Sequence, residues 1–261
     1  MRSRAIARTV ITVAAAVVVT GVVTFAQGPG RGAAQQPQPP PSPRAAAPID
    51  LTGYWVSIVN EDYRWRMITP PKGDYASVPL TDEGRKVADA WDPSQDGRCD
   101  AYGIGGLMRM PTRLNIMWES DTVLKIETDA GQQTRRLFFD AARPVPTSRT
   151  LQGFSRAQWQ RAVPAGRGGP PPTGPAPGSS LKVTTTQFRG GWLRRNGVPY
   201  SENATVTEYF DRFPAPDGAE WLVVTTIVSD AKFLNQDFVT SSHFKKEPDA
   251  SKWSPSPCRA S

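Results

Sequence analysis

The chain has 261 residues, of which 38% are hydrophobic and 21% charged, and its formal net charge is +7. Five arginines lie in the first 48 residues, where no acidic residue occurs, so the chain from residue 49 onward is nearly neutral. A nearly neutral domain has no electrostatic reason to seek phosphate, which excludes nucleic acid as an expected partner.

The N-terminus has the three parts of a secretory signal peptide, which we place at residues 1–26. A basic stretch precedes an apolar run from Thr9 to Phe25, and the small residue Ala26 then offers a cleavage site. The alternative is an uncleaved anchor, because the run approaches the roughly 20 residues that span a bilayer. Its many Ala and Val residues favour cleavage, after which we expect no stable membrane insertion and a periplasmic or secreted protein.

Two segments of low complexity flank and interrupt the domain. Residues 27–48, rich in Pro, Ala and Gln, have almost nothing to bury and predict a disordered tether. The folded domain is therefore expected at residues 49–261. Within it, residues 164–180 are so rich in Pro and Gly that they predict a surface loop or a join between two halves.

Strand patterns dominate the first part of the domain. Residues 51–59 predict one strand, and residues 63–69 a second, in which Tyr63, Trp65 and Met67 alternate with arginines. A short helix is expected from Thr81 through Trp91, because a Thr cap followed by acidic residues suits a helix N-terminus.

The remaining elements are also strands. Three of them, 113–119, 123–128 and 134–139, are joined by two tight turns and must be antiparallel neighbours. Four more follow the loop, over residues 181–188, 204–213, 220–228 and 238–245. This spacing predicts an all-β fold, an antiparallel up-and-down barrel or a sandwich, with one helix of consequence.

The chain has two cysteines, Cys99 and Cys258. In an exported protein an even pair is more often bridged than free, so we expect a disulfide that ties an early loop to the end of the chain. Two unpaired thiols are the alternative.

Motifs for metal, cofactor or nucleophilic chemistry are missing from the sequence. With one histidine, His243, a two-histidine metal site cannot be built, and no nucleophile elbow, P-loop, C-x-x-C or H-E-x-x-H occurs. We expect no metal and no cofactor. His243 is the one histidine that a catalytic triad could use, although lone strand histidines are usually structural.

Glu208 is the most informative acidic residue. It shares a strand face with Val206 and Phe210, which are expected inside, and an inward carboxylate costs free energy unless it is paired. The candidate partners are Arg66, Arg109 and Arg136. Glu208 is then a buried ion pair that fixes the barrel register, or it is a ligand anchor or acid in a pocket.

Other candidate ligand contacts lie in a turn and among the tryptophans. The proline-stiffened turn that follows Asn196 and Gly197 places Tyr200, Ser201 and Glu202 at the rim, where function tends to sit. Most of the eight tryptophans are explained by core packing, while one or two, such as Trp118, could line an aromatic pocket.

The chain resembles a large group of uncharacterised secreted bacterial proteins with a lipocalin-like β-barrel domain. The resemblance covers nearly the whole mature domain, and Gly53 to Trp55 is also similar to the glycine-x-tryptophan signature of lipocalins. That group often has a histidine where this chain has Tyr200. The resemblance implies export and a lipocalin-like barrel, and it implies no activity. The segments that carry it are 51–55, 80–84, 107–111, 126–127, 135–140, 153–156, 192–193, 197–202, 206–208 and 253–258.

From these patterns we expect a binding protein whose barrel holds a small, largely apolar molecule, because barrels of about eight strands can enclose one such ligand. Its polar anchors would be Arg66, Tyr200, Ser201, Glu202 and Glu208. One alternative is an acid–base enzyme, such as an isomerase, cyclase or hydratase, acting on a small hydrophobic substrate. Another is a structural or interaction module of the envelope.

Overall fold

The computed structural model describes residues 39–161 and 179–260. The expected signal peptide, the tether as far as residue 38 and nearly all of the low-complexity loop lie outside these residues. The compact unit begins at Pro41, so residues 41–48, which the composition assigned to the tether, belong to it. Within the described residues, no helix is long and apolar enough to span a bilayer.

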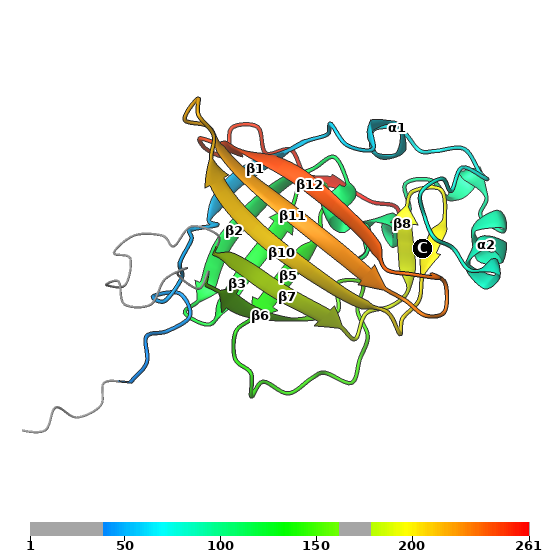
Figure 1. Cartoon of the computed structure of the whole chain (residues 1–261). Helices are drawn as coiled ribbons and strands as arrows, with labels where there is room; N and C mark the ends of the chain where they lie inside the picture. Colours follow the sequence, from blue (N-terminus) through cyan, green and yellow to red (C-terminus); the bar gives the residue numbers. More distant parts are fainter. Residues whose placement is uncertain (1–38, 162–178, 261) are drawn as a thin grey trace, which may run out of the picture. The chain divides into compact units, whose positions relative to one another are not determined.

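The chain forms a closed barrel of nine strands (Figure 1), which confirms the expected all-β fold. Every neighbouring pair is antiparallel except β5 and β6, which pair in parallel at Leu137–Ser155 and Phe138–Arg156. In barrel order, the strands are β1 (Gly53–Ile58), β12 (Phe238–Glu247), β11 (Glu220–Ser229), β10 (Thr205–Pro214), β7 (Ser180–Thr186), β6 (Phe154–Gln160), β5 (Thr134–Phe138), β3 (Val123–Thr128) and β2 (Arg113–Ser120).

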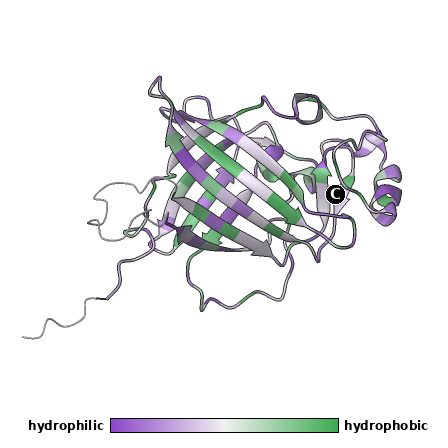
Figure 2. Ribbon diagram, in the orientation of Figure 1, coloured by the Kyte–Doolittle hydropathy of each residue, from purple (hydrophilic) through white to green (hydrophobic). Residues whose placement is uncertain are grey.

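The strands alternate between apolar and polar side chains, as the banded colouring of the ribbons shows (Figure 2). The inward set includes Trp55, Phe210, Leu222 and Phe244, all of which are fully buried. A cavity that admitted water would leave exposed surface on its lining, so side chains fill the barrel at this level. The hydrophobic effect of this filled interior is the main stabilising term of the fold.

One end of the barrel, where β1 ends and β2 begins, is covered by short helices and a two-stranded hairpin; we call it the capped end. A second cluster of buried apolar side chains, separate from the barrel core, lies at this end and includes Ala88 of α2. Thr81 caps α2 by accepting a hydrogen bond from Gly84 N at 3.0 Å, as the sequence predicts. The elements of the cap are α1 (Tyr63–Arg66), α2 (Asp82–Asp89), η1 (Pro93–Gln95), η2 (Cys99–Tyr102), η3 (Leu107–Arg109), β8 (Gly191–Arg194) and β9 (Val198–Tyr200).

The prediction of a strand at residues 63–69 is wrong, because this segment contains the one-turn helix α1. The physical reason is that β1 is paired along both edges, with β12 on one side and β2 on the other. A following strand therefore has no free edge on which to form a hairpin. The chain instead crosses the capped end.

The opposite end of the barrel is covered by residues 41–48. Trp159 Nε1 donates to the carbonyl oxygen of Pro43 at 2.8 Å, and the Trp159 ring lies 6.5 Å from Trp118. Arg161 also donates to Ala46 O at 2.8 Å. These contacts hold the start of the compact unit against the strand ends.

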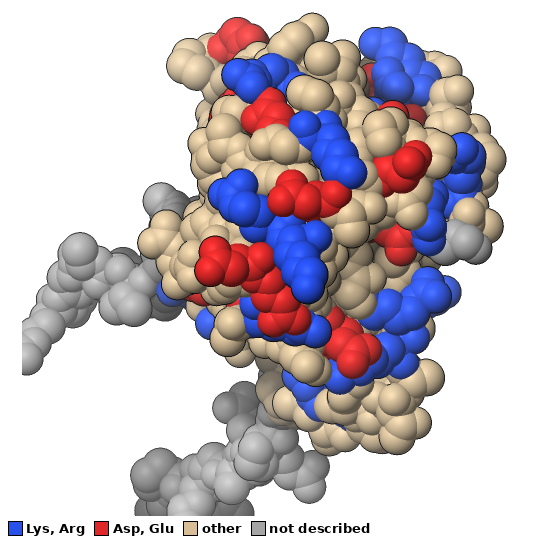
Figure 3. Space-filling model, turned by 90° about the vertical axis from the view of Figure 1, so that its right-hand side faces the viewer, with Lys and Arg blue, Asp and Glu red and all other residues tan. Residues whose placement is uncertain are grey.

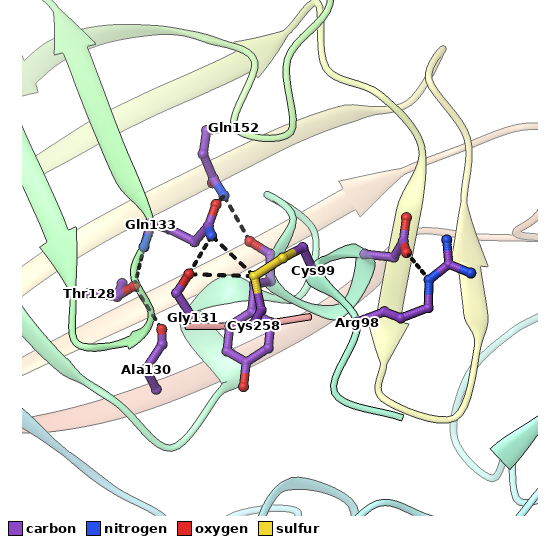
Figure 4. Close-up of a disulfide and its surroundings, with 10 residues drawn as sticks. Arg98, Cys99, Thr128, Ala130, Gly131, Gln133, Gln152 and Cys258 are labelled. Atoms are coloured by element: carbon purple, nitrogen blue, oxygen red, sulfur yellow. Dashed lines mark hydrogen bonds and ion pairs between the residues drawn. A yellow bond between two sulfur atoms is a disulfide. The ribbon is translucent and has the colours of Figure 1, made fainter. Parts of the chain in front are cut away.

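The disulfide expected from the sequence is present between Cys99 of η2 and Cys258, residues separated by 159 positions. It ties the C-terminal segment to the cap, where β13 (Ser256–Pro257) pairs with β4 (Ala130–Gly131). Gln133 lies between the sulfur of Cys258 and the side chain of Gln152 (Figure 4), and its Nε2 donates to Gly131 O at 2.6 Å.

Candidate functional site

Residues 60–69, which we call the strap, cross the capped end and carry α1. Asp62, the residue before α1, lies in the left-handed region, with φ of 55°, a conformation that Asp tolerates better than most residues. Its carboxylate accepts a hydrogen bond from Arg109 Nη1 at 2.8 Å, and Arg66 Nε donates to Arg109 O at 2.8 Å. The strap is thus fastened to η3 on its inner side.

The outer side of the strap is fastened to Asp74. This carboxylate accepts hydrogen bonds from Arg64 Nη2 at 2.5 Å and from Trp65 Nε1 at 3.1 Å. The hydrogen bond from Arg64 is the main reason why the pKa of Asp74 is lowered from its usual value. Together these contacts fix which way the side chains of α1 point.

A pocket of about 510 Å³, which we call the apolar pocket, lies beside the strap. Its wall includes Tyr63 and Met67, which are 60% and 41% exposed although both are apolar. A volume of this size is typical of sites for small organic molecules. The lining residues are Val56, Ser57, Ile58, Val59, Asn60, Tyr63, Met67, Pro111, Thr112, Arg113, Asp129, Ala130 and Ser254.

The polar residues of the apolar pocket are held in place by one another. Asp129 accepts hydrogen bonds from Thr112 Oγ1 at 2.9 Å and from the backbone N–H groups of Arg113 and Ala130, each at 2.7 Å. Arg113 Nε in turn donates to Glu247 Oε2 at 2.9 Å. These groups give the pocket a rigid polar side opposite its apolar wall.

On the other side of α1, three buried arginines meet, Arg66, Arg109 and Arg194, which we call the arginine cluster. They come from α1, η3 and β8, and none is more than 5% exposed. Arg194 stacks over the Trp65 ring, with its guanidinium carbon 4.5 Å from the ring centroid. The cluster lines a small enclosed cavity of about 10 Å³.

Three of the predicted site residues lie together at the capped end: Arg66, Arg109 and His243. His243 Nδ1 is 2.5 Å from Glu61 Oε1, and the other oxygen of Glu61 lies 3.5 Å from Arg66 Nη1. His243 therefore reaches the arginine cluster through a carboxylate.

Glu208 lies apart from this site, inside the barrel. The prediction that it points inward with Val206 and Phe210 is confirmed, since all three are fully buried. Its partner is Arg135, whose Nη1 and Nη2 lie 3.1 and 2.5 Å from the two carboxylate oxygens. The sequence analysis considered Arg66, Arg109 and Arg136 for this role, and none of them holds it; Arg136 points outward to Glu119.

The other predicted contacts are scattered. Tyr200 is buried against Phe188, and burial raises the pKa of its hydroxyl. Ser201 donates its hydroxyl to Asp230 Oδ1 at 2.8 Å, while Glu202 lies on the surface, 3.7 Å from Arg149 Nε. Trp118 belongs to the aromatic group at the opposite end of the barrel. The structure does not bring these four residues into the site.

A second pocket, of about 520 Å³, lies where β5 and β6 pair in parallel. Its aromatic side is formed by Phe138 and Phe154, stacked at 5.2 Å, with Arg143 over the Phe138 ring at 4.0 Å. We place the candidate site at the capped end because two features lie there on the two sides of one short helix: an apolar pocket, and buried arginines that, among the described residues, leave several N–H donors unpaired.

Sequence reasoning missed several residues of this site, above all Glu61, Asp62 and Arg194. The only available signal was the pair of acids directly before the arginines of the strap. The face of the molecule that carries the cap shows basic and acidic side chains interspersed (Figure 3), in keeping with the near-neutral charge of the domain. In the described residues, no three His, Cys, Asp or Glu side chains form a metal-binding group.

Comparison of the chain with protein-family models, with curated proteins and with solved structures finds no match.

Proposed function

We propose that this protein is an exported binding protein that takes a small, largely apolar molecule in the apolar pocket at the capped end. The observation that carries the proposal is the exposed apolar wall formed by Tyr63 and Met67 beside a pocket of about 510 Å³. Apolar side chains in water cost free energy that a bound apolar molecule would recover, at roughly 25 cal/mol per Å² of surface covered.

The proposed ligand site lies at the end of the barrel and not in its interior, where the sequence suggested it. Side chains of the core occupy the space that an interior ligand would need. The polar side of the apolar pocket, with Arg113 and Asp129, supplies the few fixed polar groups that orient ligands in such sites.

Export is part of the proposal. The disulfide between Cys99 and Cys258 supports an oxidising compartment, and the expected signal peptide supports a periplasmic or secreted location within that class.

An acid–base enzyme is the less favoured alternative. The carboxylate considered as its base, Glu208, is fully buried and held by both terminal nitrogens of Arg135. A paired carboxylate inside a filled barrel lacks the access to substrate that general base catalysis requires.

The test is a titration with a neutral apolar fluorophore, N-phenyl-1-naphthylamine, followed by its fluorescence. We expect saturable binding to the unaltered protein and at least about tenfold weaker binding to Met67→Asp, which places a charge on the pocket wall. The matched control is Ile68→Asp, because Ile68 is 65% exposed on the same strap but does not line the pocket. Its affinity should equal that of the unaltered protein.

Equal weakening by both variants, or no saturable binding, would overturn the proposal. A companion measurement is native mass spectrometry of protein purified from its own host, where we expect a bound small molecule. Recovery of a protein partner in its place would support an interaction module of the envelope instead.

A further inference from the structure

The arginine cluster concentrates positive charge in a buried part of the molecule. Arg66, Arg109 and Arg194 are 2%, 5% and 4% exposed, and all three line the same enclosed cavity. Burying a charged group costs several kcal/mol unless an opposite charge and hydrogen bonds compensate it. The described residues supply only part of that compensation.

Two carboxylates face the three guanidinium groups. Asp62 lies 2.8 Å from Arg109 Nη1, and Glu61 lies 3.5 Å from Arg66 Nη1. Glu61 is shared, since His243 Nδ1 lies 2.5 Å from its other oxygen. A third carboxylate, Asp74, accepts hydrogen bonds from Arg64 and Trp65; like Asp62, it favours the charged form of Arg194 electrostatically but forms no ion pair with it. Within the described residues, Arg194 therefore has no ion-pair partner.

Many hydrogen-bond donors of the arginine cluster also lack an acceptor among the described residues. In the part of the chain that the structure describes, six buried guanidinium nitrogens have no hydrogen-bond partner: both Nη atoms of Arg66, Nη2 of Arg109, and Nε, Nη1 and Nη2 of Arg194. A buried donor without an acceptor is destabilising, and native proteins contain few of them. So many around one cavity indicate a missing acceptor.

The arginines nevertheless keep their charge. Burial, and next the repulsion from Arg109, lower the pKa of Arg66 and of Arg194 to about 10. Both groups are still protonated at neutral pH. Neutralisation by loss of a proton is therefore not how the molecule resolves the excess of positive charge.

We propose that the arginine cluster binds one monatomic anion, of which chloride is the probe, in the cavity between Arg66, Arg109 and Arg194. The cavity of about 10 Å³ is about the size that one water molecule requires, and it does not admit a phosphate or sulfate. Water fits but brings no charge. A halide brings the missing negative charge and accepts hydrogen bonds from several directions at once.

The chloride site is distinct from the apolar pocket, so each proposal can be disproved without disproving the other. Chloride would bind on the side of α1 that carries Arg66, and the apolar probe would bind on the side that carries Tyr63 and Met67. Loss of one response in a variant that keeps the other distinguishes them.

The experiment measures the Tm of the protein while sodium chloride replaces sodium gluconate at constant ionic strength. We expect a saturable rise of about 3–6 °C at a tenfold excess of chloride over its Kd, because a ligand that binds only the native state stabilises it. The same rise is expected with bromide. In Arg194→Met the rise should vanish, and the Tm in gluconate should equal or exceed that of the unaltered protein.

Arg136→Met is the matched control, since Arg136 is half exposed and lies on the barrel wall away from the cluster. It should keep the full response to chloride. A chloride response that persists in Arg194→Met, or a response to sulfate as large as that to chloride, would overturn the proposal. Independently of any variant, anomalous scattering from crystals soaked in bromide should show a peak between the three arginines, and its absence would overturn the proposal as well.

Discussion

Two Arg–Glu pairs on neighbouring positions of β5 differ almost only in burial. Arg135 points inward to Glu208, with both residues fully shielded from solvent, whereas Arg136 points outward to Glu119 and both are half exposed. In each pair two guanidinium nitrogens contact the two carboxylate oxygens. The exposed pair of Arg136 and Glu119 therefore serves as a control for the effect of burial on the pair of Arg135 and Glu208.

We predict that Glu208→Gln lowers the free energy of unfolding by about 3–5 kcal/mol, because it leaves Arg135 charged and without a counterion in the core. Glu119→Gln should change stability little, since water solvates Arg136. Urea denaturation followed by tryptophan fluorescence measures both. The double variant Arg135→Met with Glu208→Leu should regain most of the loss. If Glu208→Gln cost no more than Glu119→Gln, the inner pair would not be shielded as described.

The inward position of Glu208 was predictable, and its partner was not. The alternation of Val206, Glu208 and Phe210 fixes the face of one strand without any knowledge of the rest of the fold. Choosing between Arg135 and Arg136 requires the register of β3 against β5 and the closure of the barrel, which no local pattern contains. The same holds for Arg194, which is buried while its neighbour Arg195 is half-buried.

At the scale of elements, the hairpin of β8 and β9 positions Arg194, and its turn packs against Trp91. Gly197 in that turn has φ of 80°, and a Cβ atom there would lie 2.4 Å from the side chain of Trp91. Gly218, in the turn between β10 and β11, has φ of 79° and open space around it. The two glycines share a backbone conformation and differ in their surroundings.

We predict that Gly218→Ala lowers the free energy of unfolding by about 1–2 kcal/mol, the strain of a left-handed alanine. Gly197→Ala should cost roughly 1–3 kcal/mol more, because it must also displace the ring of Trp91. Thermal or urea unfolding of both variants gives the comparison. Equal losses would mean that the hairpin turn does not pack against Trp91.

The strap shows where pattern reasoning fails at this scale. Alternation of aromatic and basic residues at 63–67 is the pattern of a strand, but the segment has no free sheet edge to join. Arg66 turns inward and lies beside Glu61, whereas Arg64, Tyr63 and Met67 are left outside. Long strands with regular spacing were predicted correctly because local and tertiary preferences agree in them.

At the scale of the whole molecule, the all-β barrel follows from strand spacing, while the order of all its strands does not. The sequence predicts the antiparallel run of β2, β3 and β5 from its two tight turns. The parallel contact between β5 and β6 depends on the crossing of residues 139–153, which have no periodic pattern. The expected barrel is confirmed, but the parallel neighbourhood of β5 and β6 that completes it was beyond what separate segments can indicate.

The disulfide acts at this same scale, because it joins positions 159 residues apart. We predict that replacing both Cys99 and Cys258 by Ser lowers the free energy of unfolding by about 5 kcal/mol, as the entropy of closing so long a loop implies. Urea denaturation of the double variant measures the loss. A loss below about 1 kcal/mol would mean that the reduced, unfolded chain is already compact.

Residues 41–48 cover the end of the barrel that is opposite the apolar pocket. Arg44 N donates to Asp121 O, just beyond the end of β2, whereas Arg113, where β2 begins, lines the apolar pocket. A strand of this length separates the two by about 25 Å. Residues 41–48 and the apolar pocket therefore lie at opposite ends of the barrel, so that a surface which held the compact unit by residues 41–48 would leave the pocket accessible.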